Sequence, residues 1–210
     1  MFEKKEKHEQ KKPIFRTSQD EVWEQLSREI QGRFIEGETS KGGKVTAKVG
    51  EWTVTLDLYC VDTHHNHIVY TRMRAPFVNK DGFRFLIYRQ TYFTAIEKYF
   101  GLQDIETGNP DFDKNYVIQG NNEEKVKQLF SNAKIREIIH SLPVFYGQVR
   151  NDDGWFHEEF PEGVDELYCL VEEKLTDIKK LKDMFELFSE ILNTLCHIGS
   201  AYEKDPNIDI

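Results

Sequence analysis

The sequence contains no long apolar run and few cysteines. No stretch approaches the ~18 apolar residues that a transmembrane helix needs, so we expect no membrane span. The opening residues, MFEKKEKHEQKKP, lack the apolar core and the small-residue cleavage site of a secretory signal. The three cysteines, Cys60, Cys169 and Cys196, are widely spaced among apolar neighbours, which is typical of reduced, buried thiols. These features predict a cytoplasmic protein, and a disulfide with one free thiol is the alternative.

Basic residues are also scarce. The 210 residues contain 28 Lys and Arg against 37 Asp and Glu, which gives a net charge of -9. An acidic chain of this kind argues against nucleic acid and against a bare anionic membrane surface as partners. With 39% hydrophobic and 13% aromatic residues, the chain has enough apolar surface for a sizeable folded core.

The usual cofactor and catalytic motifs are missing. Gly42 and Gly43 are not followed by the Lys-Ser/Thr of a phosphate-binding loop, and there is no G-x-G-x-x-G or G-x-S-x-G pattern. We therefore expect no cofactor and no catalytic residue. The absence favours a non-catalytic protein but leaves an enzyme open.

The length and patterning predict one domain with short tails. We interpret residues 1–13 as a flexible charged tail, 14–203 as a single α+β domain and 204–210 as a C-terminal tail. A first helix is expected from Ser18, where Ser18 and Glu21 have the spacing of a capping box. Its apolar stripe runs to Phe34, and Gly37 ends it.

Alternating residues predict most of the sheet. Residues Trp52–Cys60 alternate without a break and carry the strongest strand signal. Asp81-Gly82 predicts a tight hairpin between strands at Ile68–Phe77 and Phe83–Arg89, and hence an antiparallel meander. The other expected strands are Lys44–Val49, Tyr116–Gln119, Val144–Val149, Trp155–Phe160 and Glu166–Glu172.

Later helices follow from apolar spacing and caps. The longest is an amphipathic helix from Asp177 to Tyr202, whose apolar stripe is widened by Met184, Leu187, Ile191 and Ile198. Shorter helices are expected at Thr94–Phe100, from Asn121 or Asn122 to Asn132, and at Ile135–Leu142. The predicted fold is α+β: an antiparallel sheet of six to eight strands with an N-terminal helix, short middle helices and a long C-terminal helix packed on it. A helix-grip arrangement is one form it can take.

Three arginines form the main candidate site. Strand periodicity places Arg72 and Arg74 on one face, and Arg84 is expected across from them. Guanidinium groups held on a sheet bind phosphate or carboxylate bidentately, so these residues are candidates for a small anionic ligand. The alternative is that each arginine pairs with one of the surplus carboxylates. The nearby Tyr70 and Tyr88 suit either a partner surface or cross-strand packing.

A metal site has weaker support. His65 and His67, in a histidine-rich turn with His64, are weak candidates because metal ligands usually converge from two elements. The acidic run Asp104, Glu106, Asp111 and Asp113 does not have the spacing of an EF-hand loop. We therefore expect no metal.

The stretch Asp104–Leu142 carries a resemblance. Its Asp111-Phe112-Asp113-Lys114 core leads to Tyr116-Val117, a polar turn and a helix through Leu129. In this order of features it resembles a segment of a bacterial domain family of unknown function, and the remaining chain looks like a Bacillus-type hypothetical protein. The resemblance implies a bacterial origin and carries no activity or site residue with it.

Three functional hypotheses follow. The first is a binding or interaction module that recruits a protein partner through a sheet face, edge or groove. The second is a small-molecule-binding protein or enzyme with a pocket between the sheet and the C-terminal helix. The third is a structural homo-oligomer, such as a homodimer, joined through that helix.

Overall fold

The structure is a computed structural model and describes residues 18–37, 42–62, 67–90, 103–151, 160–208 and 210. Its strands form one antiparallel sheet in the order β1-β2-β3-β4-β9-β8-β5-β7-β6. In chain order the strands are β1 (Arg33–Ile35), β2 (Lys44–Val49), β3 (Trp52–Asp62), β4 (His67–Val78), β5 (Phe85–Arg89), β6 (Gln103–Asp104), β7 (Tyr116–Gly120), β8 (Phe145–Arg150) and β9 (Val164–Val171). The predicted α+β class is confirmed, and the two β-rich halves of the sequence join in a single nine-stranded sheet.

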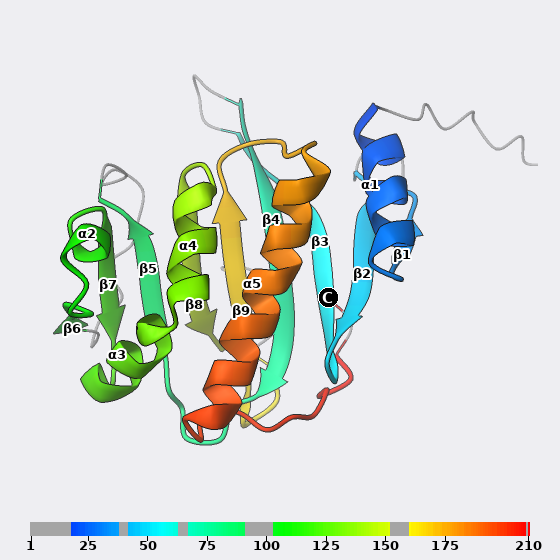
Figure 1. The fold of residues 1–210 in the computed structure, drawn as a ribbon. Helices are drawn as coiled ribbons and strands as arrows, with labels where there is room; N and C mark the ends of the chain where they lie inside the picture. Colours follow the sequence, from blue (N-terminus) through cyan, green and yellow to red (C-terminus); the bar gives the residue numbers. More distant parts are fainter. Residues whose placement is uncertain (1–17, 38–41, 63–66, 91–102, 152–159, 209) are drawn as a thin grey trace, which may run out of the picture.

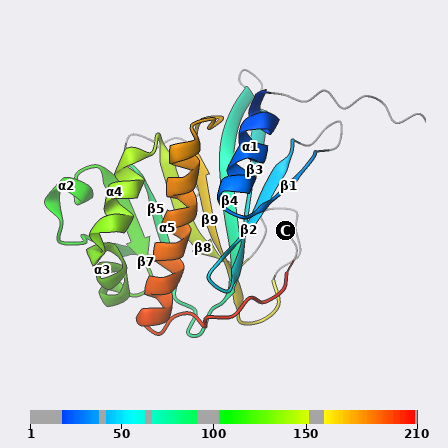
Figure 2. The same ribbon diagram turned by 45° about the vertical axis from the view of Figure 1, so that its right-hand side comes forward.

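The helices gather on one face of this sheet (Figures 1 and 2). They are α1 (Ser18–Glu29), α2 (Pro110–Asp113), α3 (Glu123–Ser131), α4 (Ala133–Ser141) and α5 (Ile178–His197). Helix α5 crosses the middle of the sheet, α1 covers β2 on one side, and α3 and α4 cover the other side. We call the sheet surface under these helices the helix-covered face, and the opposite surface the open face. The second name refers only to the described helices, because several side chains on that face, such as Leu86, Gln148 and Tyr168, are buried.

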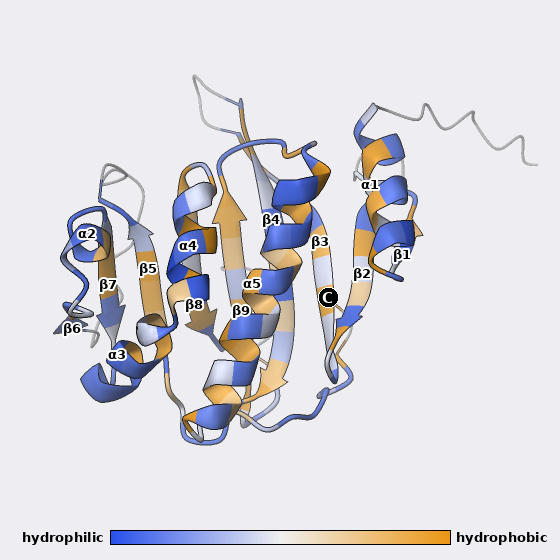
Figure 3. Cartoon of the chain, viewed as in Figure 1, coloured by the Kyte–Doolittle hydropathy of each residue, from blue (hydrophilic) through white to orange (hydrophobic). Residues whose placement is uncertain are grey.

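The core lies between the sheet and the helices. Strand register aligns one apolar residue from each of seven neighbouring strands on the helix-covered face: Val45, Leu56, Met73, Cys169, Gly147, Ile87 and Ile118. Strands such as β5 and β9 are correspondingly rich in apolar residues, whereas the helices alternate between hydrophilic and apolar residues (Figure 3). Alternation along each strand therefore sends a second set of side chains to the open face.

The first helix ends earlier than predicted. Helix α1 stops at Glu29, and Phe34 lies in β1 opposite Val45. Gln31 has a positive φ of 55°, and a Cβ on Gly32 would lie 2.7 Å from the carbonyl oxygen of Thr46. The chain therefore reverses at this point against β2, which a stripe of four-residue steps in the sequence could not reveal.

The predicted meander is wrong at the step from β4 to β5. Strands β9 and β8 lie between them, so Asp81-Gly82 does not close a hairpin. Instead, Asn79 accepts a hydrogen bond from the Gly82 N–H at 2.9 Å and forms an isolated bridge with Ala201. The turn is therefore tied to the chain that follows α5.

Helix α5 begins as predicted and ends sooner. The Asp177 side chain caps it by accepting from the N–H groups of Lys179 and Lys180 at 2.8 and 3.2 Å. The helix ends at His197, and Gly199 adopts a φ of 75°, so the predicted extension to Tyr202 is wrong. Tyr202 instead donates its N–H to the Val78 carbonyl of β4.

The wide apolar stripe of α5 is covered within the chain. Its flanking residues Met184, Leu187 and Ile191 are buried because α1 and α4 pack on either side. Lys134 of α4 pairs with Glu186 of α5 at 3.2 Å. The stripe therefore gives no argument for a homodimer joined through this helix.

Two predicted elements are not addressed by the structure. The expected helix at Thr94–Phe100 lies outside the described residues, as does most of the expected strand at Trp155–Phe160. The predicted middle helices are confirmed as α3, which Asn122 caps, and α4, which Asn132 caps.

Candidate binding surface

A row of mostly half-buried side chains crosses the open face. Strand register places one residue from each of six neighbouring strands side by side: Asp57, Arg72, Leu170, Tyr146, Tyr88 and Val117. We call this set the open-face row. Tyr88 is 8% exposed, and the other five are of intermediate burial. At about 4.8 Å between strands, the row spans roughly 24 Å. It combines tyrosine, arginine and aliphatic side chains, and tyrosine and arginine are enriched where proteins bind one another.

Two of the three predicted anion-site arginines meet on this face. Arg72 donates to both oxygens of Asp57 at 2.8 and 2.7 Å, and Arg74 donates to Asp57 Oδ2 at 2.9 Å. The Arg72 guanidinium also lies 5.2 Å from the ring centre of Tyr59. The shared carboxylate of Asp57 holds Arg72 within the open-face row and Arg74 beside the row.

Arg84 does not join them. Its Nη2 lies 3.5 Å from Asp165 Oδ1, and Asp165 also accepts from the Asn79 side chain at 2.5 Å. Burial raises the pKa of Asp165, against the lowering effect of Asn79 and Arg84. Each of the three arginines therefore contacts a carboxylate, which was the alternative to an anion site. A shared anion site remains a prediction without geometric support.

A second ion pair lies deeper on the open face. Arg150 Nε donates to Glu166 Oε2 at 2.8 Å, and Glu166 is 0% exposed. The Arg150 guanidinium lies 3.7 Å from the ring centre of Tyr168, and that ring meets Tyr146 edge to face. Burial raises the pKa of Tyr168 well above its usual range. This cluster fixes the ring of Tyr146 within the open-face row.

The sequence reasoning missed this cluster. The signal was present in the strand expected at Glu166–Glu172, because period-two alternation places Glu166, Tyr168 and Leu170 on one face. The pairing of β9 with β8 brings Arg150 opposite Glu166, and that pairing could not be read from the sequence.

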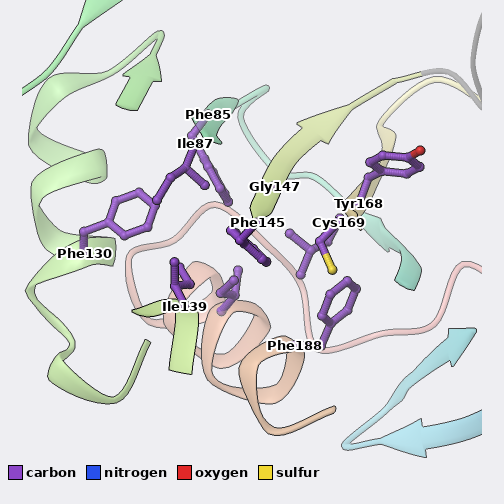
Figure 4. Close-up of a pocket in the computed structure, with 11 residues that line it drawn as sticks. Phe85, Ile87, Phe130, Ile139, Phe145, Gly147, Tyr168, Cys169 and Phe188 are labelled. Atoms are coloured by element: carbon purple, nitrogen blue, oxygen red, sulfur yellow. The ribbon is translucent and has the colours of Figure 1, made fainter. Parts of the chain in front are cut away.

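Between the sheet and the helices, the described residues line a small apolar cavity. The enclosed apolar cavity there has a volume of about 10 Å³ and is lined by side chains such as Phe85, Phe130 and Phe188 (Figure 4). A ligand pocket usually has several hundred Å³, and this volume is at the limit for one water molecule. It is a packing defect in the core and does not support the small-molecule hypothesis.

The weak metal candidates do not gather in the described part of the chain. His67 is exposed and its Nδ1 lies 2.5 Å from Asp62 Oδ1, whereas His65 lies outside the described residues. In the acidic run, Asp113 Oδ1 accepts from the Thr107 N–H and hydroxyl, which closes the loop before α2. No cluster of three potential metal ligands occurs among the described residues.

The chain after α5 reaches the open face. Asp205 Oδ2 accepts from Lys48 Nζ and from the Thr53 hydroxyl, each at 2.6 Å. Thr53 alternates with the buried Trp52 and Val54, so it points to the open face. The predicted C-terminal tail is thus anchored beside β2 and β3 through Asp205.

Comparisons with known proteins give one structural neighbour. No family model matches the chain, and no curated protein matches it. The crystal structure of the mycobacterial trehalose monomycolate transport factor A, TtfA, is similar with a TM-score of 0.51 and 6% sequence identity. The match covers 85% of this chain and 97% of TtfA, so it shows a shared fold over most of both chains. In the described residues, no helix has the length and apolar character needed to cross a bilayer.

Proposed function

We propose that the chain is a non-catalytic binding module that recruits a protein partner through the open face of its sheet. The open-face row carries this proposal, because it crosses six strands with aromatic, aliphatic and arginine side chains, and five of its six residues keep part of their surface exposed. The ion pairs at Asp57 and Glu166 hold its members in place, and a surface ordered before binding loses less conformational entropy when a partner docks.

The fold neighbour is consistent with this role. TtfA is named as a transport factor, a description that fits a protein working by binding rather than by catalysis. We also propose a cytoplasmic location, because all three cysteines are free thiols. The expectation that they are buried holds for Cys169, whereas Cys196 is partly exposed and Cys60 is exposed. Membership of an uncharacterised bacterial family, which the Asp104–Leu142 segment suggested, is part of the same proposal.

The test is a comparison of the two faces by affinity purification from the native cells. The variant Val117→Lys/Leu170→Lys places two charges in the open-face row, and Asn193→Lys places one on the exposed side of α5. We expect the first variant to lose a partner that the wild type and Asn193→Lys both retain, with thermal melting confirming that each is folded. A partner lost only by Asn193→Lys would move the binding surface to the helices and contradict the proposal.

The small-molecule hypothesis has a separate test. A thermal-shift screen against metals, nucleotides, phospho-sugars and lipids detects any ligand that binds the native state, because such binding raises the apparent stability. We expect no shift. A ligand that stabilises the wild type but not Val117→Lys/Leu170→Lys would show that the open face binds a small molecule. That result would contradict the proposal of a protein partner.

A further inference from the structure

Strand β4 extends past the end of its neighbour β9. Their pairing stops at Thr71 opposite Val171, and the β3–β4 hairpin continues above the sheet (Figure 1). Among the described residues, His67–Tyr70 pair with β3 alone. The Thr71 N–H donates to the Glu173 carbonyl at 3.0 Å, toward the β9 side. Because backbone groups alternate in direction along a strand, the N–H and C=O of Val69 and His67 point the same way, beyond the end of β9.

This projecting hairpin also exposes apolar side chains. Tyr59 is 39% exposed, and in the described part of the chain only Tyr202 is a more exposed large hydrophobic residue. Val61, Ile68 and Val69 are half-exposed. A two-stranded ribbon is at best marginally stable in water, and an open strand edge is a template for pairing with another chain. A third strand against β4 would satisfy the edge and bury part of this apolar surface.

The side chains beside the β4 edge are mostly acidic, which favours some partner strands over others. Glu172 follows β9 next to Tyr70, and its Oε2 is buried without a hydrogen-bond donor from the described residues. Burial and the nearby Glu172 carboxylate raise the pKa of Tyr70. Glu173 adds an exposed carboxylate, which the exposed Lys174 follows in sequence. Asp62 adds another exposed carboxylate, whose Oδ1 lies 2.5 Å from His67 Nδ1, and Arg72 is engaged with Asp57. The surroundings of the edge therefore favour a basic side chain.

We propose that the His67–Tyr70 edge of β4 binds an extended segment of a partner protein by β-strand addition, and that a basic residue of this segment reaches Glu172. The proposal rests on the proposed function and specifies its partner as a strand with alternating apolar side chains and flanking Lys or Arg. Main-chain hydrogen bonds supply affinity in this mode, and side-chain contacts supply specificity.

The test uses fluorescein-labelled peptides with a Val-Thr-Val-Thr-Val centre, flanked by two lysines or two glutamates on each side. Fluorescence anisotropy measures binding to the full chain. We expect the lysine-flanked peptide to bind about tenfold more tightly than the glutamate-flanked one, and Glu172→Gln to reduce that preference. Binding should slow amide hydrogen exchange at His67–Tyr70. Equal affinity for the two peptides, or no change in exchange at this edge, would overturn the proposal.

Two matched changes isolate the backbone contribution. Val69→Pro removes the outward N–H at an edge position where proline is tolerated, whereas Val69→Thr keeps this N–H. We expect Val69→Pro to abolish peptide binding and Val69→Thr to retain it. A lysine-flanked peptide N-methylated along one edge should also fail to bind, which tests the same hydrogen bonds if Val69→Pro does not fold. Binding by the N-methylated peptide would contradict strand addition.

The remaining outcomes separate this proposal from the proposed function. The wild type could instead dimerise as its concentration rises, and Val69→Pro could abolish this dimerisation. That result would show that the β4 edge pairs with a second copy of the chain, and it would overturn the proposal of a partner protein. Loss of the native partner in Val117→Lys/Leu170→Lys, together with full retention in Val69→Pro, would reject the edge and leave the open face as the binding surface.

Discussion

The two faces of one sheet differ in what their side chains do. On the helix-covered face, the row through Leu56, Met73 and Cys169 is apolar and lies under α5. On the open face, the neighbouring row through Asp57, Arg72 and Leu170 mixes charge with apolar surface. The same strands therefore supply a core on one side and an ordered polar and aromatic surface on the other.

This difference between the faces suggests that one face stabilises the fold and the other recognises a partner. Burial of apolar area contributes about 25 cal/mol per Å², and the core between the sheet and the helices contains most of the buried hydrophobic side chains. A buried ion pair such as Arg150–Glu166 is weak evidence for stability, because desolvation offsets much of its Coulomb energy. A face that retains such a pair beside the partly exposed Tyr146 is better explained by recognition than by folding.

The largest expected effect compares two leucines of β9. Leu167 is 1% exposed on the helix-covered face, and Leu170 is half-exposed on the open face. We expect Leu167→Ala to lower the free energy of unfolding by about 4 kcal/mol, because it leaves a cavity in the core. Leu170→Ala should cost about 1 kcal/mol or less. Urea denaturation of both variants measures the difference.

Equal losses in the two leucine variants would mean that the open face is packed as tightly as the core. That result would remove the contrast between the faces and weaken the case for a binding surface. Asn193→Ala, on the exposed side of α5, is the control and should change the stability by less than about 0.5 kcal/mol.

The ion pair on the open face provides the second test. Arg150→Met removes the guanidinium beside a carboxylate that is 0% exposed, and we expect a loss of about 3 kcal/mol. Arg150→Met/Glu166→Met should recover most of this loss, because replacing both charges removes the desolvation cost as well. A double variant as unstable as the single one would show that the pair contributes to stability directly. Chemical denaturation of the wild type, Arg150→Met, Glu166→Met and the double variant completes the cycle.

Local patterns predicted the elements far better than their pairing. Period-two alternation located Trp52–Cys60 within β3, and asparagine and aspartate caps located the starts of α3 and α5. The order of strands depends on long-range packing, so Asp81-Gly82 favoured a hairpin that the sheet does not contain. Phe34 continues the helical stripe in the sequence, but in the structure it lies in strand β1. The chain reverses before it, where Gly32 approaches β2 closely.

Sequence patterns predicted only part of the candidate surface. Strand periodicity placed Arg72 and Arg74 on one face correctly, since both contact Asp57. It placed Arg84 with them, but the pairing of β4 with β9 brings Asp165 near Arg84 instead. Tyr146 and Leu170 entered the surface only through the register of β8 with β9, which depends on contacts distant in sequence.

The smallest expected effect concerns the C-terminal segment on the open face. Burial raises the pKa of Asp205, but the hydrogen bonds from Lys48 and Thr53 outweigh it and hold that pKa below the ordinary 3.8. A lowered folded-state pKa contributes stability above the unfolded value, and this stability is lost as the pH falls from about 4 through the folded-state pKa. We expect Asp205→Asn to cost about 1 kcal/mol at neutral pH and to remove this part of the acid sensitivity.

Hydrogen exchange at pH 7 locates the effect of Asp205→Asn. Protection should fall at Lys48–Thr53 on the open face, while the amides of α5 and the strands beneath it remain protected, because no core contact changes. Loss of protection throughout α5 would mean that the C-terminal segment supports the core, and the two faces would then not be energetically separate. Protection lost only beside β2 and β3 would show that this segment covers part of the open face and can leave it without unfolding the domain.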